Sequence, residues 1–151
     1  MDEGGSFGGL VRKVNLYLES SVVVGWLLKE PGRLPEPESF DGAFASAVIE
    51  LEVSRALRRH IAEKRIDQED LDRLLDLSTV WFGQIGIVPL SRAILTRAAG
   101  PFPTIVNALG AIHLATALIW REETGDDVAF LTHDRRLRAA ARACRFPISR
   151  P

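Results

Sequence analysis

The sequence predicts an α/β fold, a three-layer α/β/α sandwich around a parallel sheet of about four to five strands. Short apolar segments alternate along the chain with longer segments of helical periodicity. The short segments are apolar on both faces, as strands are when helices cover both sides of a parallel sheet. With 151 residues, the chain suits one hydrophobic core. We therefore expect a single domain over residues 13–151, preceded by a flexible lead-in over residues 1–12.

Apolar spacing, helix caps and breaking residues define the expected elements. Strands are predicted at 14–18, 43–45, 85–90 and 128–131, with a possible last edge strand at 146–148. Helices are predicted at about 22–29, 46–63, 67–82, 91–99 and 104–121, and from residue 134 onward. The expected caps are Ser20 or Ser21, Ser46, Asp67, Ser91 and Asp134. Three prolines and two glycines predict a loop over 31–42.

Composition indicates a cytoplasmic protein without a membrane span. No apolar run approaches the ~18 residues that a spanning helix needs, and the N-terminus opens with acidic rather than basic residues. The single cysteine, Cys144, cannot form an intramolecular disulfide and fits a reducing compartment. The net charge is −1, so the whole chain carries no bias toward nucleic acid.

Basic residues are nevertheless grouped in two places along the chain. One group includes Arg55 and Arg59, and the other begins with Arg135 and Arg136. Each group is either a solvated helix face or a rim that binds RNA phosphates.

Three acidic residues are the candidates for chemistry. Glu19 closes the first predicted strand and Asp134 follows the strand at 128–131, so both lie at the edge where parallel strands end. Glu52 lies at the margin of an apolar helix stripe, where a half-buried acid needs a partner. Two structural alternatives remain open: Glu52 pairs with Arg55 or Arg59, and Asp134 is only a helix cap.

Clustered carboxylates are suited to a hard divalent cation. Mg²⁺ prefers oxygen ligands and is commonly bound by one or two carboxylates with water. Such a cation activates water and neutralises negative charge on a phosphodiester. The three acids therefore indicate hydrolysis assisted by a hard cation such as Mg²⁺.

Four segments together resemble the motifs of the PIN domain family, in the family's order. The segment from Glu19 to Val23 resembles its Asp-Thr-Ser-Ala opening, and the segment from Glu52 to Leu57 resembles its second motif. Residues 108–117 are similar to the family's Leu-Asp-Ala-x-His-Leu-Ala-x-Ala helix, and residues 131–137 to its fourth motif. The likeness extends from about residue 14 to 148 and is nearest to VapC-type toxins of toxin–antitoxin pairs.

This resemblance implies a Mg²⁺- or Mn²⁺-dependent endoribonuclease that forms a homodimer and is inhibited by a small antitoxin protein. It places the family's four acids at Glu19, Glu52, Gly110 and Asp134, with these three acids as catalytic residues and metal ligands. Glu19 is one methylene longer than the family's aspartate, and Gly110 removes one ligand altogether. In the expected mid-helix position, this glycine costs about 0.5–1 kcal/mol relative to alanine.

Neighbouring polar residues have expected supporting roles around these acids. Ser21 and Thr132 can orient a carboxylate, and Asn107 can offer an amide oxygen near Gly110. His113 is expected to be a structural hydrogen-bonding residue behind the site, not a ligand. Two functions follow: an RNA-cleaving toxin whose site is weakened by Gly110, or a catalytically impaired PIN-like domain that acts by binding RNA or protein.

Overall fold

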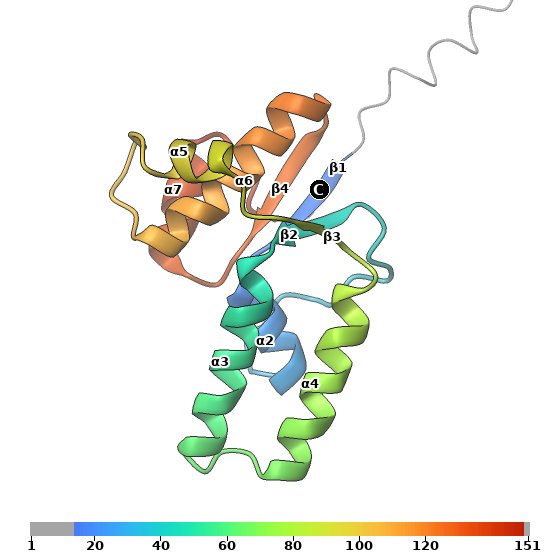
Figure 1. Ribbon diagram of the computed structural model, residues 1–151. Helices are drawn as coiled ribbons and strands as arrows, with labels where there is room; N and C mark the ends of the chain where they lie inside the picture. The colour runs from blue at the N-terminus through green and yellow to red at the C-terminus, as the bar shows by residue number, and fades with distance from the viewer. Residues whose placement is uncertain (1–13, 150–151) are drawn as a thin grey trace, which may run out of the picture.

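A computed structural model describes residues 14–149 of the chain (Figure 1). Its strands are β1 (Val14–Leu18), β2 (Ala43–Ser46), β3 (Gly86–Val88) and β4 (Asp127–Leu131). Its helices are α2 (Ser20–Leu28), α3 (Val48–Ala62), α4 (Gln68–Phe82), α5 (Arg92–Ala98), α6 (Ala108–Thr124) and α7 (Arg135–Ala143). The lead-in expected at residues 1–12 lies outside the described residues. None of the helices within residues 14–149 is long and apolar enough to cross a membrane.

The four strands form one parallel sheet in the order β3-β2-β1-β4. Side chains alternate between its two faces. Leu16, Ala45 and Leu131 join the core beneath α2, α3 and α4. Tyr17, Phe44 and Phe130 join a second core beneath α6 and α7. Helix layers on both faces, visible in Figure 1, confirm the predicted three-layer sandwich.

The register between β1 and β4 brings the ends of these strands together. Leu18 lies opposite Leu131, and the Glu19 N–H donates to the Leu131 carbonyl at 3.1 Å. Glu19 and Thr132 are therefore neighbours at the carboxyl edge of the sheet. Asp126 and Asp127 lie at the opposite end of β4, where Asp126 accepts a hydrogen bond from Asn15.

Helix starts differ from the sequence prediction in three places. The cap of α2 is Glu19, not Ser20 or Ser21, because the Glu19 carboxylate accepts from the Ser21 N–H. Ser46 ends β2 and leaves the cap position of α3 to Ala47, although its Oγ accepts from the Val48 N–H. Helix α6 begins at Ala108 rather than 104. The caps predicted at Asp67, Ser91 and Asp134 are confirmed.

The possible edge strand at 146–148 does not form. This segment runs beside β4 and accepts only one backbone hydrogen bond from it, from the Phe130 N–H to the Pro147 carbonyl at 2.7 Å. Proline has no N–H with which to continue a strand ladder. The apolar pattern instead serves packing, because Phe146 is buried in the core beneath α6 and α7.

Candidate active site

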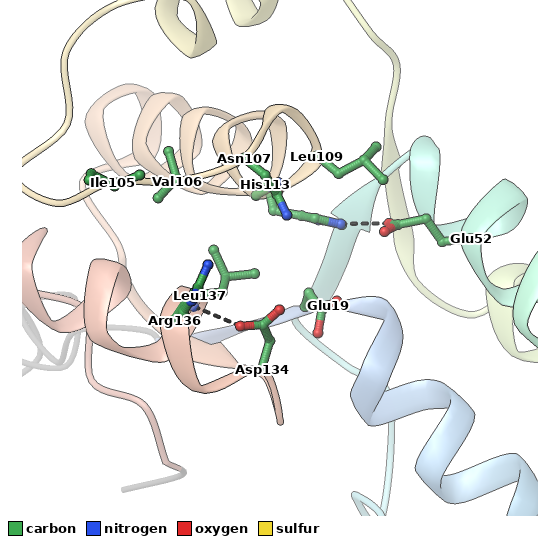
Figure 2. Close-up of a pocket in the computed structure, with 11 residues that line it drawn as sticks. Glu19, Glu52, Ile105, Val106, Asn107, Leu109, His113, Asp134, Arg136 and Leu137 are labelled. Carbon is green, nitrogen blue, oxygen red and sulfur yellow. Dashed lines mark hydrogen bonds and ion pairs between the residues drawn. The ribbon is translucent and has the colours of Figure 1, made fainter.

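Three acidic side chains meet at a pocket of about 260 Å³ at the carboxyl edge of the sheet. Glu19 follows β1, Asp134 follows β4 and Glu52 reaches in from α3, opposite the start of α6 (Figure 2). The structure therefore brings together the three acids that the sequence singles out. In parallel sheets this edge is the usual place for a ligand.

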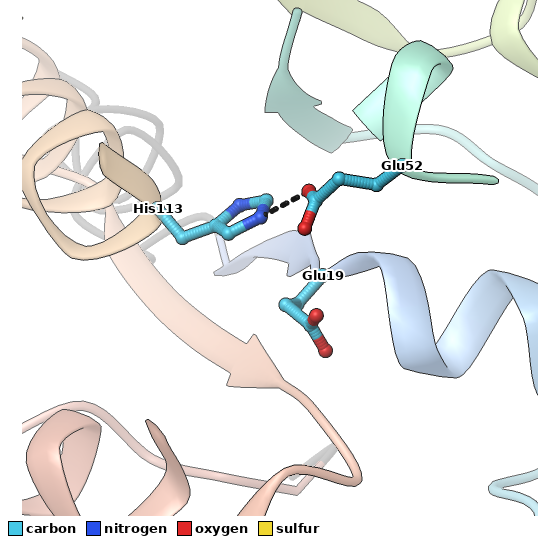
Figure 3. Close-up of side chains that lie close together, drawn as sticks. All are labelled: Glu19, Glu52 and His113. Atoms are coloured by element: carbon cyan, nitrogen blue, oxygen red, sulfur yellow. Dashed lines mark hydrogen bonds and ion pairs between the residues drawn. The ribbon is translucent and has the colours of Figure 1, made fainter. Parts of the chain in front are cut away.

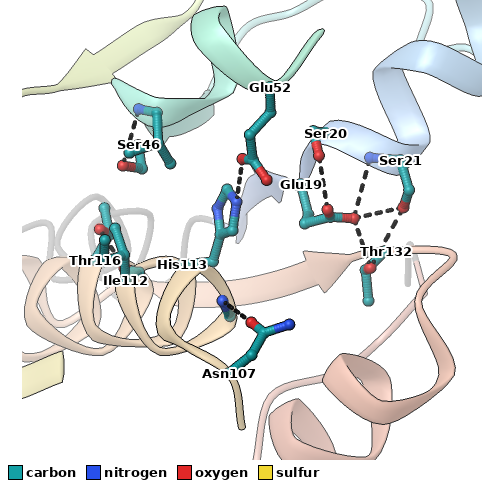
Figure 4. A network of polar contacts seen from close by, with 12 residues as sticks. Glu19, Ser20, Ser21, Ser46, Glu52, Asn107, Ile112, His113, Thr116 and Thr132 are labelled. Atoms are coloured by element: carbon teal, nitrogen blue, oxygen red, sulfur yellow. Dashed lines mark hydrogen bonds and ion pairs between the residues drawn. The ribbon is translucent and has the colours of Figure 1, made fainter. Parts of the chain in front are cut away.

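Glu19 is buried and held by four hydrogen-bond donors. Its carboxylate accepts from Ser20 Oγ at 2.9 Å, from Thr132 Oγ1 at 2.7 Å, and from both the N–H and the Oγ of Ser21 (Figure 4). Only 6% of the residue is exposed. Ser21 and Thr132 thus orient a carboxylate, as the sequence suggests. The longer glutamate side chain also turns back to cap α2.

Glu52 is paired with His113 rather than with an arginine. Its Oε1 lies 2.6 Å from His113 Nε2 (Figure 3), and the two side chains are 17% and 1% exposed. Among the described residues, Glu52 forms no ion pair with Arg55 or Arg59, so that alternative is wrong. The partner comes from α6. His113 lies about one helical turn after Gly110, on the same face of this helix, and both residues line the pocket.

Tyr17 lies behind His113 in the core. Its hydroxyl is 2.5 Å from His113 Nδ1 and accepts a hydrogen bond from the Ser46 N–H at 3.3 Å. Burial raises the pKa of Tyr17 well above its usual value, and the charges of Glu19 and Glu52 raise it further against the opposing Ser46 N–H. The phenol therefore keeps its proton at neutral pH.

Asp134 occupies a more open part of the pocket. Its Oδ1 accepts from the Leu137 N–H at 3.0 Å and caps α7, so the capping alternative is present in the structure. The residue is exposed, and one side chain of the pocket, Arg136, follows it on α7. A cap with an exposed second oxygen can still take part in binding a ligand.

The compact group of possible metal-binding atoms differs from the expected one. Glu19, Glu52 and His113 each offer an atom within 4.8 Å of the others, whereas Asp134 borders the pocket outside this group. Two carboxylates so close together repel each other, and a divalent cation between them relieves the repulsion. The residues present therefore fit a divalent cation, with Asp134 near enough to line the same pocket.

Gly110 presents no side chain where the family's third acid is expected. It lies in the first turn of α6, so the prediction of a mid-helix glycine is wrong. Asn107 Oδ1 accepts from the Gly110 N–H at 2.7 Å, and this oxygen caps the helix instead of replacing a carboxylate. A Cβ added to Gly110 meets the same oxygen at 3.1 Å, so a larger residue needs a small shift of the exposed Asn107 side chain.

The arginines expected to bind RNA lie around this pocket. Arg136 lines it, and Arg135 is exposed at the start of α7. Arg55 and Arg59 line a second groove, of about 690 Å³, which shares Glu52 and Leu109 with the first. Arg136 thus lines the same pocket as Asp134, and Arg55 and Arg59 lie on the helix that carries Glu52.

Comparison with known proteins identifies the family. A model of the PIN domain matches residues 16–143. The chain belongs to the PIN domain family. No curated protein matches the chain by sequence. A solved chain from a toxin–antitoxin complex of Klebsiella pneumoniae is similar in fold, with a TM-score of 0.54 and 14% identity over 85% of this chain and 93% of that one.

PIN domains are generally nucleases and typically use divalent metals, which agrees with the chemistry of the pocket. Sequence reasoning about this PIN domain missed Tyr17 and the direct pairing of His113 with Glu52. A signal for Tyr17 was available, because its phenol lies in the first strand, between two leucines, and precedes Glu19 by two residues. The partner of His113 had no comparable signal, since Glu52 is 61 residues away.

Proposed function

We propose that this PIN domain is a metal-dependent endoribonuclease, the toxin of a toxin–antitoxin pair, with a site weakened by Gly110. The observation that carries the proposal is the meeting of Glu19, Glu52 and Asp134 at one pocket beside exposed arginines. Mg²⁺ or Mn²⁺ is the proposed cofactor, with these three acids as its ligands. A nuclease needs both negative charge for a cation and positive charge for the RNA backbone, and the pocket and its rim supply both.

Each part of the site has a proposed task in phosphodiester hydrolysis. When bound, a divalent cation supplies activation of water and neutralises charge on the phosphate. Ser21 and Thr132 hold the Glu19 carboxylate in a fixed position. Arg135 and Arg136 on one side, and Arg55 and Arg59 on the other, bind phosphates along the RNA and place the scissile bond over the acids.

The toxin proposal includes partners and a location. A small antitoxin would inhibit the site by placing an arginine or lysine side chain in the acidic pocket, in competition with the cation. The fold shared with a chain of a toxin–antitoxin complex supports this partner. A homodimer is also proposed, supported by exposed apolar side chains such as Val80 and Leu95. The cytoplasmic location is supported by the lone cysteine, Cys144, which is free.

A cleavage assay on total RNA tests the proposal, run with Mg²⁺, with Mn²⁺ and with a chelator. We expect cleavage that depends on the cation and is lost in Glu52→Gln, which removes the charge of one proposed ligand. Gly110→Asp should raise the rate modestly, because three carboxylates already serve the site. Expression of the chain should slow growth, and a small partner should co-purify with it.

The second candidate function is a catalytically impaired PIN domain that binds RNA or protein. Gly110 favours it, together with the use of both Glu19 oxygens in hydrogen bonds. In that case the native chain does not cleave RNA, and Gly110→Asp raises activity by orders of magnitude. RNA binding that persists in Glu52→Gln but falls in Arg136→Ala would then identify the binding function.

A further inference from the structure

A buried chain of hydrogen bonds runs from the end of β2 to the Glu52 carboxylate. The Ser46 N–H donates to Tyr17 Oη at 3.3 Å, Tyr17 Oη lies 2.5 Å from His113 Nδ1, and His113 Nε2 lies 2.6 Å from Glu52 Oε1. Ser46, Tyr17 and His113 are each at most 1% exposed. The chain thus links β2, β1, α6 and α3, and its last two members, His113 and Glu52, which Figure 4 draws, line the pocket.

The backbone N–H at one end and the carboxylate at the other determine the direction of the two outer hydrogen bonds. A carboxylate only accepts, so His113 Nε2 carries the proton that it shares with Glu52. The Tyr17 oxygen accepts from the Ser46 N–H, and its own proton is available for the other ring nitrogen, Nδ1. The network therefore assigns a proton to His113 Nε2, on the side of Glu52.

This proton means that His113, unlike the two carboxylates beside it, cannot bind a metal through Nε2. A protonated Nε2 has no lone pair for a cation, and Nδ1 is already occupied by Tyr17. Of the compact group of Glu19, Glu52 and His113, only the two carboxylates are therefore free to bind a metal. Figure 3 shows one Glu52 oxygen directed to His113 while the other remains on the side of Glu19.

We propose that Tyr17 and His113 are positioning residues that hold the Glu52 carboxylate for the cation, and that His113 is not itself a ligand. The proposal rests on the proposed function, because it takes Glu52 as a metal ligand. Glutamate has a long, flexible side chain, and Glu52 faces the like charge of Glu19 across the pocket. A fixed donor at one oxygen keeps the other aimed at the cation, as partners behind metal ligands do elsewhere.

Nuclear magnetic resonance of the ¹⁵N-labelled native chain tests the assignment directly. Two-bond proton–nitrogen correlations give the protonation of each histidine ring, and His113→Gln identifies which of the three signals belongs to His113. We expect Nε2 to be protonated both without metal and with saturating Mg²⁺. A ring that lacks the Nε2 proton, either without metal or with Mg²⁺, overturns the proposal.

Calorimetric titration with Mn²⁺ tests the positioning role. Tyr17→Phe keeps the ring packed against Phe44 and Phe130 but removes the hydroxyl. We expect it to weaken Mn²⁺ binding roughly 10-fold, and His113→Leu by up to about 100-fold, the range found for residues behind metal ligands. His113→Gln should recover part of the loss, since its amide can donate to Glu52.

The matched control is Ser78→Ala, which removes another buried hydroxyl. Ser78 Oγ donates to the Leu75 carbonyl within α4, away from the pocket, so this variant should bind Mn²⁺ as the native chain does. Native affinity in Tyr17→Phe overturns the proposal, and this variant suffices if His113→Leu fails to fold. If the native chain shows the expected ring protonation and Mn²⁺ pattern but cleaves no RNA, the proposed function fails while the positioning role stands.

Discussion

Glu19 and Asp134 occupy equivalent places in the fold but lie in different surroundings. Each follows one of the two paired strands β1 and β4, and each caps the helix that comes next. Glu19 is buried and accepts four hydrogen bonds, whereas Asp134 is exposed and caps its helix through the Leu137 N–H. The same topological position therefore supports a structural carboxylate on one side of the pocket and an accessible one on the other.

Gly110 lines the same pocket and is buried in the first turn of α6. A Cβ on Gly110 would lie 3.1 Å from Asn107 Oδ1 and 3.4 Å from Leu137 Cδ1, so a side chain there packs against the α6 cap and against α7. Exposed acids contribute little to folding. The loss of the exposed Asp134 should therefore leave the core intact, whereas the loss of Glu19 would leave buried donors without a partner.

The largest expected effect on stability comes from Glu19→Ala. It removes a helix cap and leaves three hydroxyl groups and one N–H without their acceptor, so we expect a loss of about 3 kcal/mol in the free energy of unfolding. Urea denaturation of the metal-free protein measures it. Glu19→Gln keeps one acceptor oxygen and should lose less. A loss in Glu19→Ala no larger than that in Asp134→Ala would contradict the comparison.

Asp134→Ala should have a smaller effect on the same measurement. It removes one exposed cap, which is typically worth about 1 kcal/mol, and buries no unsatisfied group. Asp134→Asn keeps the cap and should restore most of that stability. Under the proposed function, both variants still weaken Mn²⁺ binding in calorimetry. Native Mn²⁺ affinity in both would remove Asp134 from the set of ligands.

Glu122→Gln gives the smallest expected effect and shows what an exposed acid contributes away from the pocket. Arg97 lowers the pKa of Glu122 through two hydrogen bonds between α5 and α6. The pair therefore stabilises the fold above the unfolded-state pKa, and this contribution is lost as the pH falls through the lower folded-state pKa. Both side chains are over 40% exposed, so solvent screening limits the loss at pH 7 to roughly 0.5 kcal/mol or less.

Denaturation of Glu122→Gln at pH 7 and at pH 3 measures that contribution. The difference from the native chain should shrink at the lower pH. A difference that grows on acidification would show that the pair does not act through the ionised carboxylate.

The sequence was most informative where structure depends on neighbouring residues. Alternating apolar segments indicated the parallel sheet, and the caps at Asp67, Ser91 and Asp134 were readable because each lies within a few residues of the N–H that it accepts from. The start of α6 was less predictable, because the apolar pattern of this helix can be extended back to residue 104. In the structure, Asn107 caps the helix and Ala108 is its first residue. Pro147 indicated that its segment would not complete a strand, because proline has no N–H for the strand ladder.

By itself, the sequence determined that Glu19 and Asp134 reach one edge of the sheet, because parallel strands all end there. Only the tertiary structure decided what surrounds them. Thr132 and Glu19 are 113 residues apart, and Tyr17 and His113 are 96 apart, so no local pattern joins either pair. Packing of α3 and α6 at the edge of the sheet paired Glu52 with His113 rather than an arginine on its own helix, because a buried imidazole and a half-buried carboxylate each need a hydrogen-bond partner.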